Sequence, residues 1–135
     1  MPRLASMTQW GPAAEATRKA IFDRVEFEIV NLSAGRPWVA CSKSRMPGIW
    51  RLEYEADVSA RRVLYEVRSW STPIAWYVED EGWVRPPIGY TSFTSRHQYV
   101  VDRALRDQQV EVRTIPRRES LALTIRIDWD WEVAA

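Results

Sequence analysis

The chain is organised around the stretch Ser69-Trp70-Ser71-Thr72-Pro73-Ile74-Ala75-Trp76, which is completed by a second stretch from Tyr90 to Gln98. Together the two stretches hold a dense cluster of hydroxyl side chains and His97, the only histidine of the sequence. Between them, apolar runs at 74–78 and 83–85 flank the four-residue loop 79–82, a pattern that predicts a β-hairpin. Pro86 and Pro87 end the hairpin, because proline cannot donate to a strand ladder.

The second stretch predicts the start of a helix. Ser95 and Gln98 have the spacing of a capping box, in which a hydroxyl caps the helix and an amide side chain follows three residues later. We expect this helix to run to about Arg106. At about 100° per residue, its inward face carries His97, Val100, Val101 and Ala104, with Leu105 at the edge.

In the flanking segments, patterns typical of helices and patterns typical of strands follow one another. Toward the N-terminus we expect a helix to about residue 23, strands at 25–31, 38–42, 50–56 and 63–67, and a turn at 31–37. Toward the C-terminus, Val110 and Val112 begin a strand, and strict alternation predicts a closing strand from Leu121 to Trp131. Residues 1–10 lack periodicity and are expected to form a flexible arm.

These elements predict an α+β fold. We expect residues 11–135 to form a single domain, in which a mostly antiparallel β-sheet has one or two helices packed on one face. A hydrophobic content of 46% argues against a disordered chain.

The composition excludes several classes of protein. Cys41 is the only cysteine, so an internal disulfide and a zinc site with several thiolates are excluded. The net charge of +1 gives no general attraction to nucleic acid or acidic membranes. No apolar run approaches the roughly 18 residues of a membrane span, and residues 1–10 lack the apolar core of a signal peptide. We therefore expect a cytoplasmic protein that does not contact membrane.

His97 is the first candidate for chemistry. One hypothesis makes it a general base, with Tyr90, Ser92 or Thr94 as the nucleophile or second acid. The other makes it a buried imidazole held by neighbouring hydroxyls such as Thr94 or Ser92. No orienting carboxylate and no nucleophile elbow accompany these residues, which favours the structural role. The sequence also lacks a Walker loop, a dinucleotide fingerprint and a metalloprotease motif, and no cofactor or metal is predicted.

The outward face of the same helix is a candidate binding surface. It carries a basic stripe with one aromatic residue: Arg96, Tyr99, Arg103 and Arg106. Such a stripe fits a phosphate backbone, although a plain solvated helix face gives the same pattern. A protein partner would instead be anchored by tryptophans, for which the candidates are Trp70, Trp76 and Trp83.

Three carboxylates share one face of the expected closing strand: Asp128, Asp130 and Glu132. Carboxylates at this spacing suit a hard cation, but they also keep an apolar strand soluble and discourage edge pairing. With no other ligands evident, the second interpretation is favoured.

The two stretches resemble a family of small bacteriophage and prophage proteins. The usual form is similar to SYxTPIA followed by YSxTTSRHQ, and it corresponds here to Ser69–Ala75 and Tyr90–Gln98. This chain departs from it at Trp70, Thr91 and Phe93. The resemblance covers about a quarter of the chain. It implies a phage-type accessory protein in a bacterial host and brings no established activity, catalytic set or cofactor.

The resemblance and the residues together predict a non-catalytic binding module for nucleic acid or a host protein. Two alternatives stay open: a small enzyme that uses His97 with a nearby hydroxyl, and a protein-only inhibitor of a host factor. The sequence predicts no oligomeric state.

Overall fold

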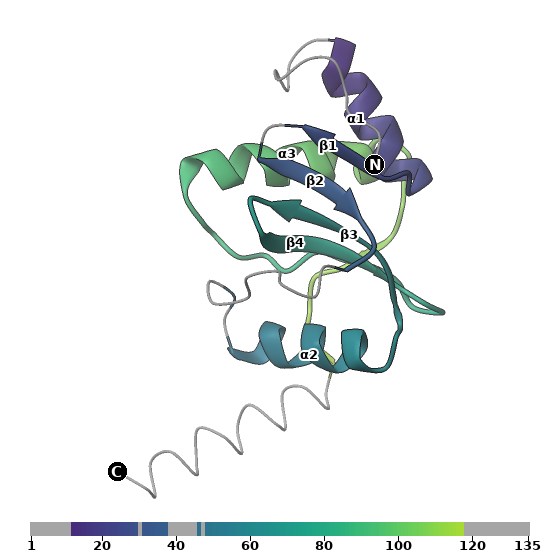
Figure 1. Cartoon of the computed structure of the whole chain (residues 1–135), viewed down its shortest axis with the longest axis vertical. Coiled ribbons are helices and arrows are strands. Elements are labelled where there is room, and N and C mark those ends of the chain that lie inside the picture. The colour runs from purple at the N-terminus through teal and green to yellow at the C-terminus, as the bar shows by residue number, and fades with distance from the viewer. Residues whose placement is uncertain (1–11, 30, 38–45, 47, 118–135) are drawn as a thin grey trace, which may run out of the picture.

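A computed structural model gives the structure of the chain and describes residues 12–29, 31–37, 46 and 48–117. These residues form three helices and six strands, in the order α1 (Pro12–Asp23), β1 (Phe27–Ile29), β2 (Leu32–Gly35), α2 (Gly48–Ser59), β3 (Val63–Ser69), β4 (Thr72–Val78), β5 (Gly82–Val84), α3 (Ser92–Arg106) and β6 (Val112–Arg113). The α+β class expected from the sequence is confirmed (Figure 1).

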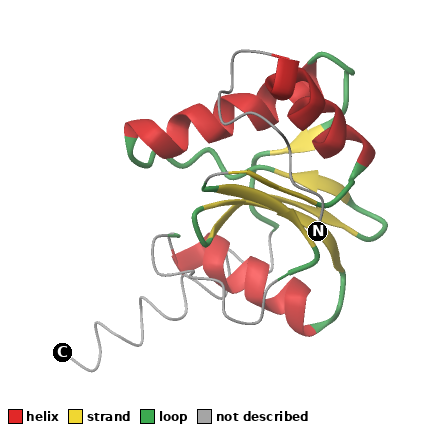
Figure 2. Ribbon diagram, turned by 45° about the horizontal axis from the view of Figure 1, so that its top comes forward, coloured by secondary structure: helices red, strands yellow, loops and turns green. Residues whose placement is uncertain are grey.

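All six strands form one sheet in the order β1-β2-β3-β4-β5-β6. The first five run antiparallel to their neighbours, while β6 lies parallel to β5 at the edge. Figure 2 shows helices on both faces of this sheet. Because both faces are covered, β3 and β4 are buried along nearly their whole length.

Two tight turns lie side by side at one end of the sheet. Asn31 ends the β1–β2 turn with φ 63°, and Trp70 begins the β3–β4 turn with φ 58°; both values lie in the left-handed region. Two-residue hairpin turns use this region because its twist matches that of the strands. The Trp70 amide donates to the Asn31 carbonyl at 2.7 Å, which joins the two turns.

The core has two parts, one on each face of the sheet. Helices α1 and α3 cover the first part, where Ile21, Val101 and Leu105 pack on strand residues that include Trp83. Helix α2 covers the second part, where Trp50 and Tyr54 pack edge-on against Trp76, with ring centroids 6.3 and 5.0 Å away. Trp76 and Trp83 are therefore core residues.

The strand predicted at 50–56 is wrong, because this segment lies in α2. Its buried residues are Trp50, Glu53, Tyr54 and Asp57, a spacing of three and four that belongs to one face of a helix. The apolar residues at 50, 52, 54 and 56 also alternate with period two, which explains the error. As a result, a third helix covers the second face of the sheet, where only one covered face was expected.

Other expectations divide into three groups. The helix to about residue 23, the strand at 63–67, the hairpin on either side of 79–82 and the strand near 112 are confirmed. The turn predicted at 31–37 is wrong over most of its length, since β2 occupies Leu32–Gly35. The arm at 1–10, the strand at 38–42 and the closing strand at 121–131 lie outside the described residues.

Candidate functional site

His97 lies in a buried hydrogen-bonded cluster that joins β3 to α3. Its Nδ1 atom is 2.7 Å from the hydroxyl of Ser69, the last residue of β3, and that hydroxyl donates to Thr94 Oγ1 at 3.1 Å. All three residues are buried, with His97 only 1% exposed. The cluster joins the two stretches around which the sequence is organised.

Burial determines the charge of His97. Desolvation disfavours the imidazolium and lowers the pKa of His97 to about 4, so the ring is neutral at pH 7. A neutral imidazole can accept a proton, but a ring that is 1% exposed offers no access to a substrate. The inward position expected for His97 is confirmed, and its burial supports a structural role.

The hydroxyls proposed as catalytic partners are divided among different environments. Thr94 is buried in the cluster, Ser92 is exposed at the first residue of α3, and Tyr90 is half-buried against the core. Sequence reasoning missed the hydroxyl of Ser69, which is 2.7 Å from the ring, because Ser69 lies 28 residues away along the chain. Of the three proposed partners, Thr94 is the one that belongs to the described cluster with Ser69 and His97.

The helix begins earlier than the sequence predicted. Thr91 is the N-cap, and its side-chain oxygen accepts from the Thr94 amide at 3.3 Å, so Ser95 lies inside α3. The capping box of Ser95 and Gln98 is therefore wrong. The Gln98 side chain instead donates to the Ile88 carbonyl at 2.8 Å and holds the preceding loop against the helix.

The outward face of α3 keeps only part of its predicted basic stripe. Arg96 and Arg106 are exposed, and Tyr99 is 40% exposed between them. Arg103 is engaged within the helix, where it forms an ion pair with Asp107 at 3.2 Å and donates to Tyr99 at 3.1 Å. The two exposed arginines and Tyr99 form the surface that a ligand can reach, together with Arg103, whose side chain is 42% exposed but shared with Asp107.

Of the three tryptophans proposed as anchors, only Trp70 is exposed, at 54%. Trp76 and Trp83 are buried at 0% and 4% exposure, so they cannot anchor a partner and that expectation is corrected. Beside Trp70 lies a hollow of about 340 Å³, which Glu28, Asn31 and Ser71 also line. The bond between Ser69 and Thr94 places this turn next to the first turn of α3.

A buried ion pair lies on the opposite face of the sheet. Arg68 donates to Glu66 at 2.7 Å and to Ser33 at 3.2 Å, and both members of the pair are 0% exposed. Tyr54 of α2 donates to the second oxygen of Glu66. Glu66 and Arg68 alternate with the apolar residues of β3, and they lie on the face that α2 covers.

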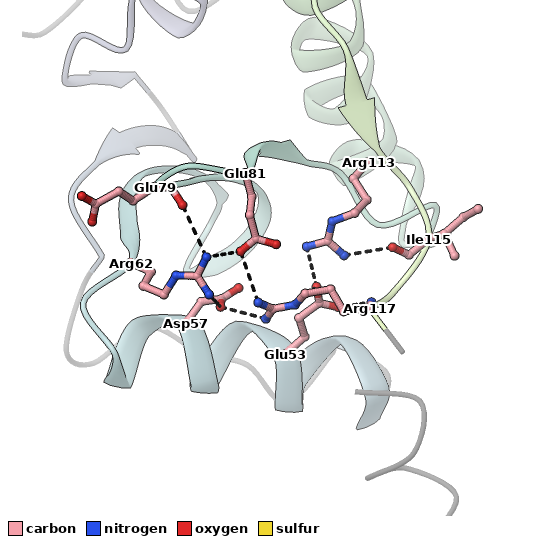
Figure 3. A network of polar contacts seen from close by, with 8 residues as sticks. All are labelled: Glu53, Asp57, Arg62, Glu79, Glu81, Arg113, Ile115 and Arg117. Carbon is pink, nitrogen blue, oxygen red and sulfur yellow. Dashed lines mark hydrogen bonds and ion pairs between the residues drawn. The ribbon is translucent and has the colours of Figure 1, made fainter. Parts of the chain in front are cut away.

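A second network fixes the segment after β6 against α2 (Figure 3). Glu53 and Asp57 of α2 are 1% and 2% exposed, and Arg117 reaches them at 3.0 and 2.8 Å. Arg113 also pairs with Glu53, and Glu81 of the β4–β5 turn pairs with Arg117 and Arg62. Each carboxylate thus meets at least one guanidinium, which leaves no excess negative charge for a cation.

The described part of the chain contains no cluster of three or more metal-ligating His, Cys, Asp or Glu side chains. None of its helices has the length and apolar character to cross a membrane. Cys41 and the carboxylates Asp128, Asp130 and Glu132 lie outside the described residues. Comparison of the chain with protein-family models, curated proteins and solved structures finds no match.

Proposed function

We propose that this protein is a non-catalytic binding module whose binding face is the outward side of α3 together with the neighbouring Trp70 turn. One observation carries the proposal: the candidate catalytic groups Thr94 and His97 are buried, whereas Trp70 and Tyr99 are 54% and 40% exposed. The resemblance of Ser69–Ala75 and Tyr90–Gln98 to small phage proteins supports an accessory role in the cytoplasm of a bacterial host.

The favoured target is single-stranded nucleic acid. Arg96 and Arg106 are exposed, and neither forms an ion pair with another described residue. Tyr99 lies between them on the same helix face, and Trp70 lies beside the first turn of that helix. Guanidinium groups contact phosphates while exposed rings stack on bases, which is how proteins bind single strands without sequence preference.

A host protein is the second candidate, because a hollow of about 340 Å³ adjoins Trp70. A large aromatic side chain next to a hollow suits a protein contact, in which few anchor residues carry most of the binding energy. An inhibitor of a host factor would use the same surface.

Titration with a fluorescent single-stranded oligonucleotide at two salt concentrations tests the first target. Binding should weaken with salt, with a log–log slope of about 0.7 per phosphate neutralised. The double variant Arg96→Glu/Arg106→Glu should abolish binding. Arg51→Glu/Arg61→Glu is the matched control, because both of these arginines are exposed on the α2 side.

The outcomes separate the two targets. If the two double variants lose equal amounts of oligonucleotide affinity, binding depends only on net charge, and the proposed binding face on α3 is wrong. If the oligonucleotide does not bind at low salt, the nucleic-acid target is wrong. The protein target then requires that Trp70→Ala abolish a host-protein contact that depends little on salt.

A further inference from the structure

Among the residues that the structure describes, the outer edge of β6 is an open strand edge. The Arg113 carbonyl accepts from the Arg85 amide at 2.9 Å, so the backbone polar groups of Arg113 point toward β5. Backbone polar groups alternate along a strand, so those of Val112 and Thr114 point away from the sheet. Among the described strands, none lies on that outer side.

Hollows lie on either side of this edge. Helix α3 overhangs the first, of about 390 Å³, whose apolar lining includes Leu105, Val110 and Val112. The second, also about 390 Å³, is lined by Trp83 and by Ile115, which is 70% exposed. Val112 and Thr114 line both hollows, so both hollows adjoin the edge at which a strand would be added.

The charges around the first hollow are unequal. Arg85 and Asp102 line it and neutralise each other through an ion pair at 3.1 Å. Arg106 also lines it, and no described residue pairs with that guanidinium. The first hollow therefore carries a net positive charge, whereas Glu81, Glu111 and Arg113 line the second.

We infer that the outer edge of β6 and the first hollow bind an extended peptide of a partner protein, which adds to β6 as a further strand. The open Val112 and Thr114 groups supply main-chain hydrogen bonds, while the hollow under α3 takes an apolar side chain. The charge of Arg106 selects a peptide with a carboxylate two residues from that apolar residue, because alternate side chains of a strand point to the same face. This surface goes beyond the nucleic-acid face proposed above, because its main-chain contacts lie on β6.

Hydrogen exchange of the full chain tests the open edge directly. The Val112 and Thr114 amides should exchange rapidly, whereas the Arg85 amide, bonded to Arg113, should be protected. The probe is an acetylated nonapeptide in which Val alternates with Thr and the central Val is replaced by Glu, so that Glu and the nearest Val side chains point to the same face. At ten times its dissociation constant it should slow exchange at Val112 and Thr114 about tenfold, and a Lys version should bind more weakly.

Thr114→Pro removes the outward amide and no hydrogen bond that the structure describes within the chain. It should weaken binding of the Glu peptide about tenfold or more, whereas Thr114→Ala, which keeps the amide, should bind like the wild type. Oligonucleotide binding should be unchanged in both variants, which separates this inference from the proposed function. If Thr114→Pro does not fold, the exchange measurement on the unmodified chain still decides.

Three results would overturn the inference. Failure of the Glu peptide to bind or to protect the two amides would mean that the edge does not accept a strand. Equal binding of the Glu and Lys peptides would remove the acidic partner. Protection of Val112 and Thr114 without peptide would mean that the edge is already covered, by this chain if protection is independent of concentration and by a second copy if it is not.

Discussion

The hydroxyl of Ser69 lies 2.7 Å from Nδ1 of His97, and this contact joins the end of β3 to the second turn of α3. The Ser69 hydroxyl also contacts Thr94 Oγ1 at 3.1 Å, and these contacts hold the neutral ring in one orientation. A serine and a histidine at this distance resemble a nucleophile and its base, but both are buried.

The first prediction concerns pH. Burial lowers the pKa of His97 to about 4, below its usual value of 6.5, so the unfolded chain binds this proton more readily than the folded chain. Stability should therefore fall as the pH decreases from about 6.5 and level off near 4, with a total loss of about 3 kcal/mol from this group. Urea denaturation at a series of pH values measures the effect.

His97→Asn is the control, because its amide can bond to Ser69 but does not titrate. Between pH 6.5 and 4, the free energy of unfolding of His97→Asn should fall less than that of the wild type, and the difference should equal the contribution of the imidazole. Identical pH dependence in the wild type and His97→Asn would contradict the buried neutral histidine.

The second prediction distinguishes the two N-caps. Thr91→Ala should cost about 1 kcal/mol, because it removes the oxygen that accepts from the Thr94 amide. Ser95→Ala should be neutral or stabilising by up to about 0.5 kcal/mol, because Ser95 is exposed inside the helix and alanine is the better helix former. Denaturation midpoints decide, and the reverse order of the two effects would restore the capping box at Ser95.

Local patterns predicted the hairpin of β4 and β5 and the inward face of α3, since these depend on neighbouring residues. Helix α2 could not be predicted in the same way. Its buried face includes Glu53 and Asp57, which are tolerated there because Arg117 lies against them from about 60 residues further along the chain. Sequence spacing alone gave no reason to bury two acidic residues.

The candidate site was predictable to a similar degree. The inward position of His97 followed from helical periodicity, whereas its partner Ser69 depends on how β3 meets α3. Trp70, Trp76 and Trp83 were equivalent in sequence. Only the turn at Trp70 and the helices on both faces of the sheet make one exposed and the others buried.

The third prediction concerns the buried ion pair. Arg68→Met should cost about 3–5 kcal/mol, because it leaves the Glu66 carboxylate buried without its guanidinium. The double variant Glu66→Gln/Arg68→Met should cost less than the sum of the two single variants, because the residues interact. Asp107→Ala, which breaks the exposed pair with Arg103, is the comparison and should cost about 0.5 kcal/mol or less. Similar costs for Arg68→Met and Asp107→Ala would contradict the burial of the first pair.

The fourth prediction concerns Arg117 and Asp57. Burial raises the pKa of Asp57 above its usual value, while the hydrogen bond and charge of Arg117 oppose that rise. Because the folded chain binds this proton more tightly than the unfolded chain, the contribution of Asp57 to stability grows as the pH falls through its folded pKa. Arg117→Ala should therefore raise the Asp57 pKa further, which an NMR titration of its carboxyl carbon measures.

Arg117→Ala should also lower the free energy of unfolding at pH 7 by about 2 kcal/mol, because Glu53 and Asp57 remain buried after the guanidinium that they share is lost. Asp57→Asn should lower the free energy of unfolding less than Glu53→Gln does. One buried oxygen of Asp57 has no hydrogen-bond partner. Glu53, in contrast, accepts hydrogen bonds from the backbone and side chain of Arg117 and also pairs with Arg113. Arg51→Ala is the matched control, an exposed arginine on the same helix that should change stability by less than about 0.5 kcal/mol. An unchanged Asp57 pKa in Arg117→Ala, or equal costs for Arg117→Ala and Arg51→Ala, would mean that the network does not fix the segment after β6 against α2.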